Sequence, residues 1–170
     1  KLSTCRFCNT ELISFCDLGQ SPLSNSFLEE NQLHIKETFY PLHAYVCEVC
    51  YLVQLDEFES PKNIFTNYAY FSSYSETWLK HCQEYTSQVI SRFKIDQNKK
   101  VIEIASNDGY LLKYFKKENI HVLGIEPAEN VAKVAESSGI PTIKSFFNTK
   151  LPRNLKAENK QADLLICNNV

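Results

Sequence analysis

The chain has 170 residues, a formal net charge of -2 and 44% hydrophobic residues. This length allows one sizeable hydrophobic core or two modest ones. The near-neutral charge gives no electrostatic reason to expect a nucleic acid or a membrane surface as a partner, and no apolar run is long enough to span a bilayer.

The cysteines and the chain ends bear on location and completeness. The odd total of 7 cysteines fits a disulfide framework poorly, which favours a reducing, cytoplasmic location. The first residues lack the apolar core of a signal peptide. The chain has no methionine and stops as an expected buried strand finishes, so we expect a fragment of a longer protein.

Residues 1–66 are expected to form a small zinc-binding domain. They carry two Cys-x-x-Cys pairs, Cys5/Cys8 and Cys47/Cys50, and two such pairs complete a tetrahedral four-thiolate site. The stretch 9–46 is longer than usual between pairs, so either an insertion loops out or the pairs lie on distant hairpins. A closed four-thiolate site leaves no open position for water, which makes the zinc structural. Metal-free cysteines and an iron–sulfur cluster are the alternatives.

Local signals in this first part indicate turns and short strands. Turns are expected at 17–22 and at 40–41, and strands at 42–46 and 52–55. The remaining cysteines (Cys16, Cys82, Cys167) are expected to be small buried hydrophobic residues. The four histidines (His34, His43, His81, His121) show no paired spacing, so we expect structural or exposed roles for them.

A linking segment, 67–98, is expected to carry a long helix over 75–93. Apolar residues recur at steps of three and four on one helical face, and Ser75 is a plausible N-cap. The residues on this face are Trp78, Cys82, Tyr85, Val89 and Phe93.

Residues 99–170 alternate between strands and helices. Strands are expected at 100–105, 121–126, 141–144 and 162–167, and helices at 109–118 and 128–138. This βαβαβ pattern predicts an α/β fold with an incomplete, Rossmann-like parallel sheet. Glu126 and Asn168 then follow carboxyl ends of strands, where such sheets bind ligands.

The turn at 103–109, Glu-Ile-Ala-Ser-Asn-Asp-Gly, carries the strongest functional signal. It has a single glycine, Gly109, and is a poor match to the dinucleotide fingerprint. Glu103 and Asp108 suit a ligand with a positive centre, and Glu126 can hold a ribose diol. S-adenosylmethionine has both features. The alternative is that Glu103 is a satisfied strand acid and Glu126 a turn residue before Pro127.

Several long motifs in order resemble the sugar C-methyltransferase family, which has a zinc-binding N-terminal domain and a Rossmann-like S-adenosylmethionine domain. The matching segments are 17–25, 68–75, 101–112, 124–132 and 163–170. The resemblance implies a methyltransferase that methylates C3 of a 4-keto-deoxysugar carried on a nucleotide diphosphate. It also implies that a histidine base and a C-terminal domain lie beyond residue 170, so this portion alone is expected to be inactive.

The expected site residues follow from both arguments. The zinc ligands are Cys5, Cys8, Cys47 and Cys50, and the expected cofactor contacts are Glu103, Ala105, Asn107, Gly109, Glu126, Pro127 and Asn168. The resemblance implies that the segment 68–75 closes over the sugar, with Tyr68, Tyr70 and Ser73 as substrate contacts; aromatic packing between domains is the alternative for the tyrosines.

Two other functions compete with the methyltransferase. One is a non-catalytic binding module, in which a zinc knuckle is fused to a degenerate Rossmann domain. The other is a dinucleotide oxidoreductase, which the missing glycines disfavour. Glu103, Gly109 and Glu126 in one expected pocket favour the methyltransferase over a scaffold.

Overall fold

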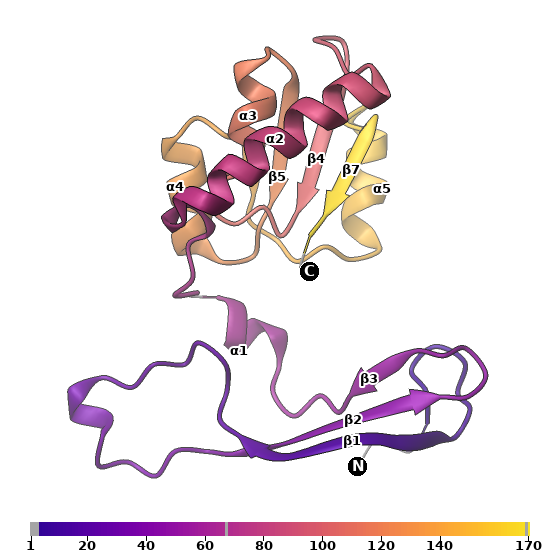
Figure 1. The fold of residues 1–170 in the computed structure, drawn as a ribbon, viewed down its shortest axis with the longest axis vertical. Helices are drawn as coiled ribbons and strands as arrows, with labels where there is room; N and C mark the ends of the chain where they lie inside the picture. Colours follow the sequence, from indigo (N-terminus) through magenta and orange to yellow (C-terminus); the bar gives the residue numbers. More distant parts are fainter. Residues whose placement is uncertain (1–3, 67, 169) are drawn as a thin grey trace. The chain divides into compact units, whose positions relative to one another are not determined.

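The computed structural model describes residues 4–66, 68–168 and 170. The chain folds as two compact units, residues 1–64 and 65–170. A short helix, α1 (Pro61–Phe65), lies at the division. Figure 1 shows a β-sheet unit at the N-terminal end of the chain and an α/β unit at the C-terminal end.

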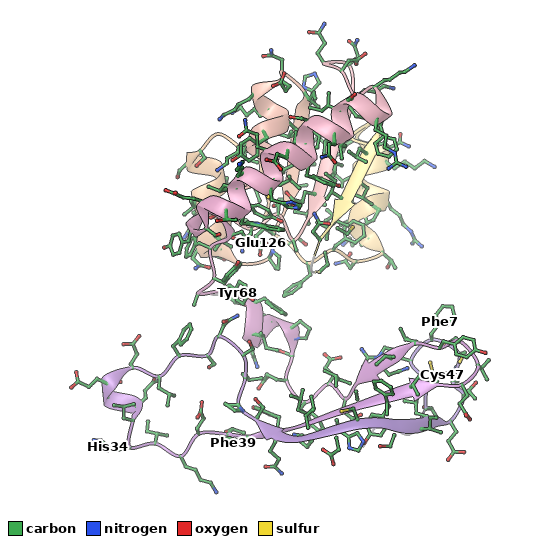
Figure 2. All side chains as sticks on the ribbon, viewed as in Figure 1. Phe7, His34, Phe39, Cys47, Tyr68 and Glu126 are labelled. Carbon is green, nitrogen blue, oxygen red and sulfur yellow. The ribbon has the colours of Figure 1, made fainter. Side chains whose placement is uncertain are left out.

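The first unit is a three-stranded antiparallel sheet of β1 (Leu12–Ser21), β2 (Tyr40–Cys47) and β3 (Val53–Leu55), in that order. A short 3-10 turn, η1 (Glu30–Gln32), interrupts the connection between β1 and β2. The two cysteine pairs flank the sheet strands, with Cys47 ending β2. Cys47 and Phe7, which lies in the first pair, are at the same end of this sheet (Figure 2).

The prediction of turns at 17–22 and 40–41 is wrong, because both segments lie largely within strands. Residues 12–21 form one strand, and Tyr40 opens the next. Asp17 pairs with His43 and Gln20 with Pro41, so two residues of β1 bulge out opposite one residue of β2. Asp17 Oδ1 accepts the Gly19 N–H at 2.9 Å, and Gly19 has φ +80°. The turn-forming residues therefore shape a β-bulge instead of ending the strand.

The second unit is a four-stranded parallel sheet with helices on both faces. Its strands are β4 (Lys100–Ile104), β5 (His121–Ile125), β6 (Thr142–Ile143) and β7 (Leu164–Cys167), in the order β6-β5-β4-β7. Its helices are α2 (Glu76–Phe93), α3 (Leu112–Lys117), α4 (Glu129–Ser137) and α5 (Lys150–Ala157), and a 3-10 turn, η2 (Ser72–Tyr74), precedes α2. Counted along the chain, this strand order is 3-2-1-4, that of a doubly wound Rossmann half. The predicted fold class is confirmed.

Two apolar clusters cover the two faces of this sheet. Residues of α2, α3 and α4 pack with Val101 and Ile166 on one face. Leu151 and Leu155 of α5 pack with Ile102 on the other. Alternate residues of β4 therefore face opposite layers, as a strand buried on both sides requires.

Most helix boundaries follow the sequence signals. Ser75 caps α2 by accepting the Trp78 N–H at 3.2 Å, as predicted. Helix α5 was not predicted, although the sequence is compatible with it. Pro152 lies in the first turn, where its missing N–H costs nothing, and Asn148 Oδ1 accepts the Lys150 and Leu151 N–H groups. Across the residues described, no helix has the length and apolar character of a membrane span.

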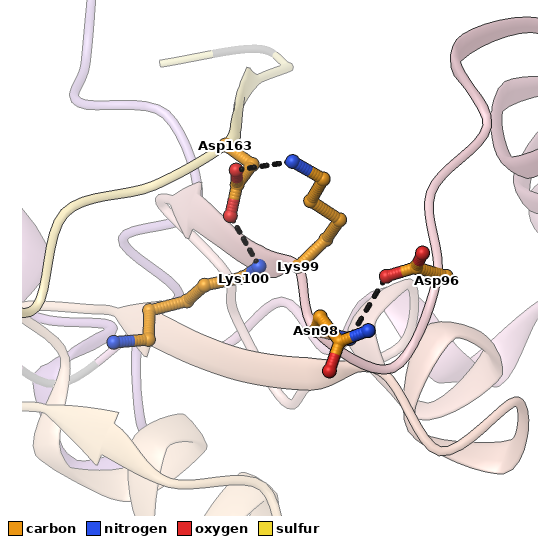
Figure 3. Close-up of polar contacts among 5 residues, drawn as sticks. All are labelled: Asp96, Asn98, Lys99, Lys100 and Asp163. Atoms are coloured by element: carbon orange, nitrogen blue, oxygen red, sulfur yellow. Dashed lines mark hydrogen bonds and ion pairs between the residues drawn. The ribbon is translucent and has the colours of Figure 1, made fainter.

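The starts of β4 and β7 are joined by one carboxylate. Asp163 Oδ2 accepts the Lys100 N–H at 2.8 Å, and Asp163 Oδ1 pairs with Lys99 Nζ at 3.1 Å (Figure 3). Asp96 Oδ1 accepts the Asn98 N–H in the loop that leads into β4. These contacts fix the amino ends of β4 and of the outer strand β7, whereas the predicted cofactor contacts lie toward the carboxyl ends of the strands.

The prediction that all three unpaired cysteines are buried is wrong for one of them. Cys82 is buried on α2 and Cys16 is half-buried, but Cys167 is exposed. The reason is that β7 is the outer strand of this sheet, with β4 on one side.

Candidate functional site

The segment after β4 is a tight turn with an unusual backbone. Ala105, Asn107 and Gly109 have φ of 54°, 48° and 78°, so three alternate residues are left-handed. A Cβ on Gly109 would lie 3.0 Å from Ile140 Cγ1, which adds a packing reason for glycine there. Non-glycine residues in this region cost free energy, and they persist where surrounding contacts fix them, often at functional sites.

Glu126, which follows β5, provides some of the contacts that hold this turn in place. Its Oε2 accepts the Asn107 N–H at 2.9 Å and its Oε1 accepts the Ala128 N–H at 2.8 Å. The side chain is 5% exposed. Burial raises the pKa of Glu126, and these two hydrogen bonds oppose the shift. Each oxygen keeps a second lone pair for a ligand hydroxyl.

Glu103 on β4 is fully buried. Among the residues described, neither of its oxygens has a hydrogen-bond partner of good geometry. Burial raises its pKa to about 8; the Tyr110 hydroxyl acts in the opposite direction, and the charges of Asp108 and Glu126 raise it further. Three buried carboxyl groups therefore surround one turn, and in the described residues none has an ion-pair partner.

The segment 68–75 is tied to this turn by hydrogen bonds. Asp108 Oδ2 accepts the Ser73 N–H at 3.1 Å and the Ser73 hydroxyl at 2.5 Å. Asn107 Oδ1 accepts the Ser72 N–H at 3.0 Å, and its Nδ2 donates to the Tyr70 carbonyl at 3.1 Å. The segment therefore lies directly over the residues expected to bind a cofactor.

The same segment is held at its other end by α4. Asn130 accepts the Tyr68 N–H at 3.0 Å and donates to the Tyr68 carbonyl at 2.7 Å. The Tyr68 ring packs edge-on against Phe65, with centroids 5.5 Å apart, and against Tyr70 at 6.5 Å. Part of the tyrosine-rich character of 68–75 is thus explained by packing, while the Tyr70 side chain is 53% exposed.

Asn168 lies apart from the Glu126 contacts, beside a cavity of about 320 Å³. The cavity is lined by residues of α2, by one residue just before α3 and by the end of β7 with the residue that follows it: Trp78, His81, Cys82, Tyr85, Leu111, Cys167 and Asn168. The Trp78 and His81 rings stack with centroids 5.2 Å apart. Sequence reasoning treated Trp78 and Tyr85 only as an apolar helix face; the cavity depends on tertiary placement that periodicity does not reveal.

The structure brings the four predicted zinc ligands together. Their sulfur atoms all lie within 4.8 Å of one another. The Cys5–Cys50, Cys8–Cys47 and Cys8–Cys50 sulfurs are 3.6, 3.4 and 3.7 Å apart. Four sulfurs at 2.3 Å around a tetrahedral metal are about 3.8 Å apart. This arrangement fits zinc in a structural site.

The protonation of these thiols also favours a cation. The Gln54 amide lowers the pKa of Cys5 to about 6. For Cys50, the lowering effect of the Leu52 backbone N–H is outweighed by burial and the neighbouring sulfurs, which raise its pKa to about 12. Four crowded sulfurs therefore do not all ionise together on their own, and a divalent cation would allow it.

Comparison with known proteins gives matches both to the N-terminal unit alone and to nearly the whole chain. Residues 5–65 match a family model described as "Putative zinc binding domain" (Methyltransf_13). The chain is 27% identical, over 165 residues, to the C-methyltransferase NovU of Streptomyces niveus. The alignment covers 96% of this chain and 39% of that relative. The predicted similarity to C-methyltransferases is confirmed, and the four-cysteine cluster fits the predicted zinc-binding domain.

Two solved structures are also similar. One is a SAM-dependent methyltransferase from Archaeoglobus fulgidus, with 22% identity, a TM-score of 0.32, and 44% of this chain and 33% of that one covered. The other is the plantazolicin methyltransferase BpumL in complex with SAH, with 15% identity, a TM-score of 0.32, and coverages of 56% and 42%. At these TM-scores the fold assignment depends on the sheet order described above.

Proposed function

We propose, from the similarity to a C-methyltransferase and from the turn after β4, that this chain is the cofactor-binding portion of an S-adenosylmethionine-dependent C-methyltransferase. The chain spans 39% of the length of the relative it matches, so the activity belongs to the longer protein. S-adenosylmethionine supplies the methyl group, and the residues of this chain bind and orient it.

The observation that carries this proposal is the set of buried carboxyl groups around the turn. Glu103, Asp108 and Glu126 are each at most 5% exposed. Uncompensated charge is costly to bury, so this site suits a ligand that brings positive charge. A sulfonium and an ammonium group meet that requirement, whereas a pyrophosphate would be repelled.

We assign the cofactor contacts as follows. Glu126 accepts the ribose hydroxyls through its remaining lone pairs, with Pro127 against the adenine. Glu103 and the backbone of Ala105, Asn107 and Gly109 surround the methionine end. Asn168, which lines the cavity together with Trp78, is assigned to the methyl end. Support for this arrangement comes from the Glu126–Asn107 hydrogen bond, which links the proposed ribose contact to the turn proposed to hold the methionine end.

We propose a nucleotide-linked 4-keto-deoxysugar as the acceptor. The motifs at 68–75 and 163–170 support this class through resemblance, and the exposed Tyr70 ring offers a surface for a sugar. Tyr68, Tyr70 and Ser73 are the proposed substrate contacts. The same resemblance assigns the base that removes the C3 proton to none of the residues of this chain, so we expect no turnover by this chain alone. We also propose a cytoplasmic location, because no disulfide bond joins the cysteines that the structure describes.

Calorimetric titration of the zinc-loaded chain with S-adenosylhomocysteine, and separately with NAD, tests the proposal. We expect micromolar binding of S-adenosylhomocysteine and no heat with NAD. NAD binding without S-adenosylhomocysteine binding would favour an oxidoreductase. Binding of neither, by this chain and by the longer protein, would favour a non-catalytic module of zinc knuckle and Rossmann domain.

A further inference from the structure

Strand β3 has an inverted burial pattern. Val53 and Leu55 are 53% and 46% exposed, whereas the polar Gln54 between them is 6% exposed. A strand at a sheet edge normally turns its apolar residues inward and its polar residues to solvent. A buried polar side chain in place of an apolar one calls for a specific partner.

The partners of Gln54 are the first Cys-x-x-Cys turn and the residue just before β3. Gln54 Oε1 accepts the Arg6 backbone N–H at 3.0 Å, which fixes the amide orientation because only the oxygen accepts. Gln54 Nε2 then faces two acceptors, Cys5 Sγ at 3.3 Å and the Leu52 carbonyl at 3.4 Å. All the polar atoms of this amide are used in holding residues 5 and 6 against β3.

The contact differs from the other hydrogen bonds to sulfur. Phe7 N–H donates to Cys5 Sγ at 3.4 Å and Cys50 N–H donates to Cys47 Sγ at 3.5 Å, each within its own Cys-x-x-Cys turn. Gln54 instead joins the first pair to β3, and β3 follows directly after the second pair. The Arg6 guanidinium reinforces the junction by donating to the Leu55 carbonyl.

We propose that Gln54 is a positioning residue of the four-cysteine metal site. It fixes the Cys5 sulfur relative to the second pair and donates a hydrogen bond that offsets the excess negative charge of four thiolates around one divalent ion. Groups that orient a metal ligand in this way typically change metal affinity about 10–100-fold when they are replaced. This role is independent of the proposed methyl transfer.

The test compares two substitutions with a matched control. Gln54→Glu keeps the length and an acceptor for Arg6 but removes the donor to Cys5, and Gln54→Met keeps the bulk without either function. Gln20→Glu makes the same charge change at an exposed position of β1. The readouts are the rate of Zn²⁺ loss to a chelator and the sulfur-to-metal charge-transfer band of the Co²⁺-substituted chain.

We expect Zn²⁺ loss to be at least about 10-fold faster in both Gln54 variants, fastest in Gln54→Glu, with a shifted Co²⁺ band and no change in Gln20→Glu. Wild-type release rates and bands in both Gln54 variants would overturn the proposal. So would a wild-type chain that takes up no Zn²⁺. If a variant unfolds, a Zn²⁺ titration decides: recovery at about 10-fold or higher Zn²⁺ supports positioning, and no recovery at any concentration overturns it.

Discussion

The Glu126 carboxylate accepts the backbone N–H of Asn107 at 2.9 Å, so the end of β5 holds the turn that follows β4. Glu126→Gln keeps one acceptor oxygen and turns the other position into a donor, which faces the N–H of either Asn107 or Ala128. We expect at least about 10-fold weaker binding of S-adenosylhomocysteine, and about 1–3 kcal/mol lower stability from the unpaired N–H. Calorimetry and urea unfolding measure the two effects.

The control is Glu129→Gln, an exposed position of α4 that lies close to Glu126 in the sequence. It makes the same chemical change without a buried hydrogen bond. Equal affinities in the two variants would contradict a role of Glu126 in the site.

Gly109 and Gly139 share φ of +78° but differ in surroundings. A Cβ on Gly109 would meet the Ile140 side chain at 3.0 Å, in the buried core, while on Gly139 it would meet the flexible Lys116 Nζ. Both alanine substitutions carry the backbone cost of a left-handed residue, about 1 kcal/mol. We expect Gly109→Ala to lose about 1–3 kcal/mol more than Gly139→Ala in urea unfolding. Equal losses would show that backbone conformation alone matters at Gly109.

Glu103 makes stability depend on pH. Its folded pKa of about 8 lies above the ordinary 4.5, so the folded chain binds more protons between these values. The free energy of unfolding should therefore fall as pH rises through this window, with a slope of about 1.4 kcal/mol per pH unit at its steepest. Glu103→Gln stays neutral and should flatten this slope. Unfolding curves across this pH range measure it, and parallel slopes in both proteins would contradict the prediction.

Metal removal should affect the first unit selectively. The four sulfurs cluster at one end of a thin three-stranded sheet, and many apolar side chains of that unit are exposed, including Phe7 and Phe15. Small domains of this kind depend on the metal for folding. We expect a chelator to open residues 1–64 to limited proteolysis while the unfolding transition of residues 65–170 is unchanged. Added Zn²⁺ should restore protection; a protected metal-free unit would contradict this prediction.

The sequence allowed the α/β unit to be predicted closely because β4 is buried on both faces and the helices are amphipathic. Ser75 began α2 as expected, and the strand order places Glu126 beside the turn at 103–109. The convergence of the two Cys-x-x-Cys pairs across the long stretch 9–46 was predicted from the chemistry of zinc ligands.

Other features depend on tertiary contacts that no local pattern records. The bulge at Gly19 uses residues that normally end a strand. Gln54 is buried because it satisfies Cys5 and Arg6, although polarity predicts exposure. Asn107 and Asn130 hold the segment 68–72 through their side-chain amides, and this role is visible only once the segment lies over the turn.

The most direct test of the proposed cofactor site is a titration of the ¹⁵N-labelled, zinc-loaded chain with S-adenosylhomocysteine, followed by amide chemical shifts. The amides of Asn107 and Ala128 both donate to Glu126, so a ligand on that carboxylate must perturb them together with Gly109. We predict that the largest saturable shifts fall within 105–109 and 126–128. Saturable shifts confined to other segments, with Asn107 and Ala128 unchanged, would contradict a cofactor site at this turn.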